Sequence, residues 1–84
     1  MRIERMYRGI PMWLARDYLI EVGGAATEDY VVRGADWTAT IRDGEFLPVG
    51  ALRIGTIHVE FEGDEKTLPM MLAAFELKTI RAGG

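Results

Sequence analysis

The middle of the chain alternates strictly between apolar and polar residues. In residues 37–42 every odd position is apolar and every even position is polar: Trp37, Thr38, Ala39, Thr40, Ile41 and Arg42. A period of two is typical of a β-strand with one buried face. Asp43-Gly44 follows as a hairpin turn signal, and residues 46–47 then begin a return strand that Pro48 confines to a sheet edge.

Three other stretches also predict strands. Residues 2–9 alternate loosely, and residues 27–33 are rich in strand-forming side chains up to Gly34. Residues 52–61 predict the last strand, but the apolar positions change from even to odd numbers: Leu52, Ile54, Ile57, Val59 and Phe61. Because a slip of one residue would send every side chain to the other face, we expect a bulge near Gly55.

Two stretches have helical spacing instead. Residues 11–22 begin at a proline, have apolar residues four positions apart and end at Gly23-Gly24, a common helix stop. Residues 68–82 form the second predicted helix, which Thr67 caps. Its apolar stripe consists of Leu68, Leu72, Phe75 and Ile80.

The order of elements is strand, helix, three or four strands, helix. It predicts an α+β fold, a two-layer sandwich in which an antiparallel sheet of four to five strands carries both helices on one face. A chain of 84 residues is long enough for one domain, residues 1–84, and not for two.

The composition excludes several kinds of function. The chain has no cysteine, one histidine and a net charge of -3. Disulfides, thiol catalysis and cysteine-zinc sites are excluded, and the expected location is a reducing cytoplasm. The negative charge argues against nucleic-acid binding, and no apolar run is long enough for a membrane helix. With no serine, phosphate loop or dinucleotide fingerprint, the sequence predicts neither an enzyme nor a cofactor.

One strand carries residues that could bind a metal. His58, Glu60 and Glu62 alternate along residues 56–62 and therefore share one strand face. An imidazole with two carboxylates is a plausible ligand set for zinc or iron, or a general-base cluster. The same alternation is what any solvent-facing strand shows, so we do not predict a metal site.

Arginines and large apolar residues give two further candidates. Two arginines of the first predicted strand and two of later strands would form an anion or small-ligand site if they converged: Arg5, Arg8, Arg42 and Arg53. The alternative is pairing with carboxylates on the open sheet face. Met12, Trp37 and Met70 are candidates for an interaction surface, and the alternative is that they belong to the core.

Gly83-Gly84 closes the sequence. Such a terminus resembles that of ubiquitin-like modifiers and sulfur carriers, which deliver it from a final strand and activate its carboxylate. Here the glycines follow a predicted helix, and the chain already uses Gly23-Gly24 to end one. Helix capping is therefore the competing interpretation.

The element order is similar to that of TATA-binding-protein-like and helix-grip folds. Several segments also resemble a small bacterial domain that occurs alone or as the C-terminal domain of proteins related to MoaD, the small subunit of molybdopterin synthase: residues 7–11, 18–19, 23–24, 34, 37 and 78–84. The resemblance implies an accessory domain without assigned catalytic residues, associated with molybdenum-cofactor or sulfur-transfer chemistry. The ubiquitin-like module of those proteins has no counterpart in the chain.

Three functions follow as hypotheses. The first is a non-enzymatic interaction domain, which binds a protein partner or a second copy through the sheet face. The second is a carrier activated at Gly84. The third is a domain that binds a small molecule between residues 68–82 and the sheet, as helix-grip proteins do.

Overall fold

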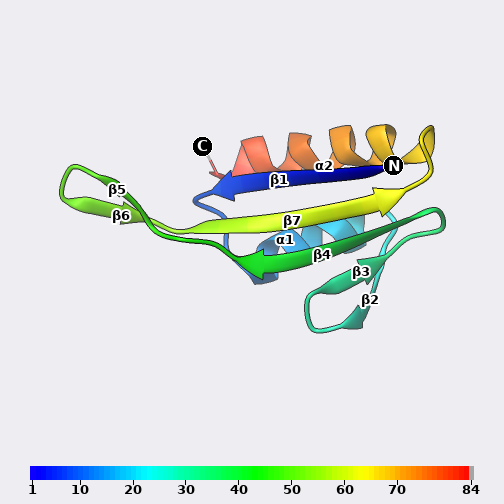
Figure 1. The fold of residues 1–84 in the computed structure, drawn as a ribbon, viewed down its shortest axis with the longest axis horizontal. Coiled ribbons are helices and arrows are strands. Elements are labelled where there is room, and N and C mark those ends of the chain that lie inside the picture. Colours follow the sequence, from blue (N-terminus) through cyan, green and yellow to red (C-terminus); the bar gives the residue numbers. More distant parts are fainter. Residues whose placement is uncertain (84) are drawn as a thin grey trace.

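The alternating segment forms β4 (Trp37–Asp43), the central strand of a five-stranded sheet (Figure 1). The computed structural model describes residues 1–83. The sheet has the strand order β1-β7-β4-β3-β2, and every neighbouring pair is antiparallel. Its other strands are β1 (Arg2–Arg8), β2 (Ala25–Glu28), β3 (Val31–Arg33) and β7 (Thr56–Gly63).

Two helices, α1 (Met12–Glu21) and α2 (Thr67–Gly83), cover one face of this sheet (Figure 1). The covered face carries the buried side chains of the central strands: Trp37, Ala39, Ile41, Ile57, Val59 and Phe61. The polar residues between them lie on the open face. The predicted α+β two-layer sandwich is therefore confirmed.

Both helices begin and end for identifiable reasons. α1 buries Ala15 and Leu19, and the chain leaves it through Gly23, whose φ of 109° favours glycine. Asp64 caps α2, because its carboxylate accepts hydrogen bonds from the backbone N–H groups of Lys66 (2.9 Å) and Thr67 (3.0 Å). These hydrogen bonds lower the pKa of Asp64. The predicted cap at Thr67 is wrong.

Two strand predictions are also wrong. Residues 27–33 are not one strand, because the chain turns at Asp29 and Tyr30 and forms the hairpin of β2 and β3. The break near Gly55 is real, but it is not a bulge. Gly55 separates β7 from β6 (Leu52–Ile54), which belongs to a different sheet.

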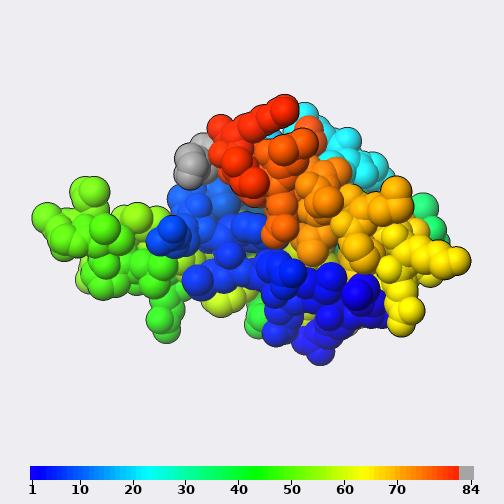
Figure 2. Space-filling view, turned by 90° about the horizontal axis from the view of Figure 1, so that it is seen from above, coloured from blue at the N-terminus to red at the C-terminus, as the bar shows by residue number. Residues whose placement is uncertain are grey.

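β6 pairs with β5 (Leu47–Val49) in a two-stranded sheet that projects from one end of the domain (Figures 1 and 2). We call residues 45–55 the arm. The expected turn at Asp43-Gly44 is absent, since Asp43 still pairs with Ile57 and the Gly44 N–H donates to Thr56 (2.9 Å). The arm is thus an excursion between two paired strands, and it lengthens the molecule to 42 × 23 × 21 Å.

Candidate functional site

The open face of the sheet is built from cross-strand pairs. His58 on β7 lies between Met6 on β1 and Arg42 on β4, and Glu60 lies beside Glu4. Residues that lie directly opposite each other on neighbouring strands point to the same face of the sheet. His58, Glu60 and Glu62 therefore line one face of β7, as the alternation predicted.

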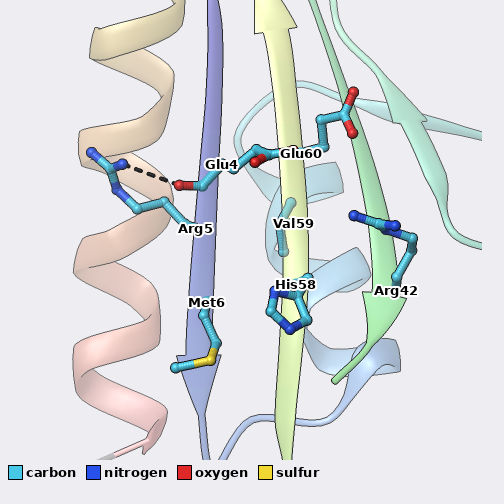
Figure 3. Close-up of a pocket in the computed structure, with 7 residues that line it drawn as sticks. All are labelled: Glu4, Arg5, Met6, Arg42, His58, Val59 and Glu60. Carbon is cyan, nitrogen blue, oxygen red and sulfur yellow. Dashed lines mark hydrogen bonds between the residues drawn. The ribbon is translucent and has the colours of Figure 1, made fainter. Parts of the chain in front are cut away.

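A shallow hollow of about 220 Å³ crosses this face (Figure 3). The imidazole of His58 lies over β7, while Arg42 extends from β4. A larger hollow of about 520 Å³ continues from His58 to the base of the arm. Gly44 makes room for the imidazole there, since a Cβ at this position would lie 2.9 Å from the His58 Cδ2 atom.

The four arginines proposed as an anion site do not converge. Arg5 pairs with Val59, so it belongs to the helix-covered side of the sheet, where its Nε atom lies 3.8 Å from Glu76 of α2. In Figure 3 its side chain extends from β1 toward that helix. Arg8 and Arg42 belong to the open face, and Arg53 lies on the arm. Period-two alternation places Arg5 and Arg8 on opposite faces of β1.

Ion pairs partly neutralise the open face. The Arg2 guanidinium lies 3.0 Å from Glu60 and 3.1 Å from Glu4. The attraction of Glu60 is the main cause that raises the pKa of Arg2. Among residues 1–83, no three His, Asp or Glu side chains are grouped closely enough to hold a metal ion. The face is a mixed-charge polar surface without a concentrated charge of either sign.

Trp37 lies in the core and not on the surface of the described structure. It is 6% exposed and packs in the core, where Gly24 and Gly34 leave room for its indole. A Cβ on either glycine would overlap the ring. Met12 is half-buried against the core, whereas Met70 is 74% exposed. Of the three predicted surface residues, Met70 is the exposed one.

α2 has apolar residues on both of its sides. The inner side packs on the sheet through Leu68, Met71, Leu72 and Phe75. On the opposite side lies a second apolar row, which we call the outer face of α2: Met70, Ala73, Ala74, Leu77 and Ile80. Leu77 is 52% exposed and Ile80 is 68% exposed. Figure 2 shows α2 (orange to red) at the molecular surface.

The predicted position of Ile80 in the buried stripe is wrong. Ile80 lies five positions after Phe75, which is well over one helical turn and rotates it away from the sheet. It lies instead three and seven positions from two other exposed residues, Leu77 and Ala73. That spacing could have identified a second stripe.

The space between α2 and the sheet is filled by side chains. Phe75 is fully buried, and its ring meets those of Tyr7 and Phe61 edge to face at centroid distances of 5.4 and 5.8 Å. The Tyr7 hydroxyl donates to Glu76 at 2.9 Å. The hollows described above lie on the open face instead. These contacts therefore give no support to the hypothesis of a ligand pocket between residues 68–82 and the sheet.

The arm also exposes apolar side chains. Phe46 and Leu52 are 65% and 69% exposed, and Val49 is exposed between them. Gly50, with a φ of 61°, closes the hairpin. An isolated two-stranded hairpin is only marginally stable in water, so the arm is the part of the fold that depends least on the core.

The structure describes one of the two glycines proposed as a carrier terminus, Gly83 at the end of α2. Gly83 is the last residue of this helix, and Gly84 lies outside the described residues. The chain therefore reaches Gly83 through a helix and not through an extended strand.

None of the helices in residues 1–83 is long and apolar enough to span a membrane.

Comparison with known proteins identifies the family. No curated protein matches the sequence. The family model described as archaeal MoaD-like protein matches residues 3–84, which is nearly the whole chain. It agrees with the resemblance to MoaD-related proteins that the sequence suggested. The chain belongs to the family of archaeal MoaD-like proteins.

Proposed function

We propose that this chain is a non-enzymatic interaction domain of a molybdenum-cofactor or sulfur-transfer system, and that it binds its partner through the outer face of α2. The observation that carries the proposal is an apolar row on an uncovered helix: Met70, Ala73, Ala74, Leu77 and Ile80. The inner row of α2 is buried against the sheet, whereas Met70, Leu77 and Ile80 of the outer row are exposed in the described structure. A contiguous exposed patch of this kind is typical of a protein-binding surface.

The polar sheet face is the weaker candidate for this role. Some of its charges pair within the same face, as Arg2 does with Glu4 and Glu60. Exposed ion pairs of this kind contribute little binding energy and are well solvated. Desolvating them would cost energy, whereas covering Met70 and Leu77 would bury apolar surface. This favours the helix layer over the sheet as the binding side.

The experiment is photo-cross-linking in the cells that make the protein. A photoreactive amino acid replaces Met70 in one variant and Glu62, on the open face, in a matched control. We expect residue 70 to form a covalent adduct with a component of cofactor assembly or sulfur transfer, identified by mass spectrometry. Adducts from residue 62 alone, or partners from neither pathway, would contradict the proposal.

A second candidate is the carrier activated at Gly84. It is supported by the match to a MoaD-like family that extends through Gly83 and Gly84. The helical approach to Gly83 weighs against it, since carriers present their terminus on a slim extended tail. Intact-mass analysis of protein from its own cells distinguishes the two. A Gly84 carboxylate with sulfur in place of oxygen would establish the carrier.

A further inference from the structure

The exposed residues of α2 have the spacing of a helix-pairing seam. Met70, Ala73, Leu77 and Ile80 follow one another at intervals of three, four and three. This is the a and d pattern by which one helix packs against another. No charged residue interrupts the row between Lys66 and Arg81 on this side of the helix.

The row is complementary to itself when two copies of α2 run antiparallel. Met70 then faces Ile80 of a second copy, and Ala73 faces Leu77 of that copy. A small residue is thus opposed to a large one on both sides of the two-fold axis, which lets the helices approach closely. A parallel pair would instead place Leu77 against Leu77 and Ala73 against Ala73, which leaves space between the two alanines.

Charge at the helix ends favours the same orientation. Asp64, Glu65 and Lys66 precede the first turn of α2 and together leave this end with a net negative charge, and Arg81 lies in its last turn. An antiparallel pair brings the acidic end of each helix next to the basic end of the other. It also opposes the two helix dipoles. A parallel pair would place Arg81 beside Arg81.

We infer that the outer face of α2 binds a second copy of this chain, through an antiparallel two-fold helix pair centred near Phe75. This inference rests on the proposed function, because it concerns the same surface: the second copy occupies the outer face of α2 when the other partner is not bound. Such an interface is isologous and closes as a dimer. A single helix face is smaller than the roughly 800 Å² per partner of a standard interface, so the dimer is reversible and dissociates on dilution.

Sedimentation equilibrium of the 84-residue chain over a range of concentrations is the first test. We expect a monomer–dimer equilibrium that Leu77→Asp shifts to monomer. Leu52→Asp is the matched control, since Leu52 is a comparably exposed leucine on the arm, and this variant should still dimerise. Circular dichroism establishes that both variants are folded. A monomeric wild-type chain at millimolar concentration, or dissociation caused by Leu52→Asp alone, would overturn the inference.

Cysteine cross-linking tests the orientation, because the chain contains no cysteine of its own. Met70→Cys and Ile80→Cys are made separately. In the antiparallel pair, residue 70 is about 15 Å along the axis from residue 70 of the second copy, beyond disulfide reach. We therefore expect disulfides when the two variants are mixed and few in either alone. Efficient cross-linking of Met70→Cys alone would overturn the antiparallel arrangement.

The two proposals fail in distinguishable ways. A monomeric chain whose residue 70 still cross-links to another protein in cells overturns the dimer and leaves the interaction domain intact. A dimer whose residue 70 cross-links to nothing but a second copy supports the inference and contradicts the link to cofactor or sulfur-transfer partners.

Discussion

The inner and outer sides of α2 are similarly apolar but have opposite environments. Leu68, Met71, Leu72 and Phe75 are at most 6% exposed, whereas Met70, Leu77 and Ile80 are more than half exposed. The sheet, which covers one side only, creates this difference. Burial of the inner side is therefore explained by this chain's own fold, and we propose that a partner explains the apolar character of the outer side.

The comparison shows how to separate fold-forming from partner-binding residues when both are hydrophobic. Truncation of an inner residue removes packing contacts that exist in the isolated chain. Truncation of an outer residue leaves those contacts intact, and its cost appears only when the partner is bound. Stability and binding measurements should therefore respond to different sides of the same helix.

The largest expected effect is that of Phe75→Ala. Phe75 is fully buried between Tyr7 and Phe61, so the variant should lose about 3–5 kcal/mol of unfolding free energy through the cavity it leaves. Leu77→Ala is the matched outer change and should stay within about 0.5 kcal/mol. Urea unfolding at low protein concentration measures both. Equal losses at the two positions would contradict the distinction between the two sides.

An intermediate effect is expected at the rim of the inner side. The Tyr7 hydroxyl donates to Glu76 at 2.9 Å, and Tyr7→Phe should cost about 1 kcal/mol through the lost hydrogen bond. Burial, and then the contact with Glu76, raises the pKa of Tyr7 above its ordinary value of 10.0. The neutral phenol is therefore favoured by folding. Its contribution is complete below about pH 10 and is lost progressively as the pH rises from there toward the higher pKa of the folded state.

The measurement is the free energy of unfolding of both proteins between neutral and strongly alkaline pH. The wild-type curve should fall more steeply than that of Tyr7→Phe, because other alkaline titrations are common to both. Parallel curves would show that the Tyr7 hydroxyl is not coupled to folding.

The smallest expected effect on stability is that of the Asp64 cap at the start of α2. The cap stabilises the helix as a whole and does not distinguish its inner side from its outer side. Backbone N–H groups of Thr67 and Lys66 lower the pKa of Asp64, so folding favours its carboxylate. The stabilisation is present above the ordinary aspartate range and is lost as the pH falls through it. Asp64→Asn preserves a capping oxygen but not the titration. Thermal unfolding of this variant should therefore depend less on pH below about pH 4.

The sequence was sufficient to predict the parts of the fold that have strong periodicity. The strand from Trp37 to Arg42 and the helix in residues 11–22 were predicted at nearly their observed positions. The change of phase across Gly55 was also detected correctly. In each case the local pattern and the tertiary environment agree, because one side of the element meets the core.

The remaining errors concern what each element packs against. Leu52 and Ile54 alternate like the residues of β7, but no layer covers them, so they form the arm. The alternation shows which side chains share a face and not whether anything covers it. For the same reason, Trp37 was proposed for a surface and Ile80 for the core. Both assignments depend on long-range packing that no local pattern records.

Photo-cross-linking from residue 70 tests the central claim most directly, because it reports contacts of the outer face of α2 in the intact cell. The account predicts strong, specific adducts from residue 70, which Leu77→Asp abolishes without unfolding the chain. It predicts few adducts from residue 62 on the open sheet face. Adducts that form at residue 62 but not at residue 70 would show that the binding surface is the sheet.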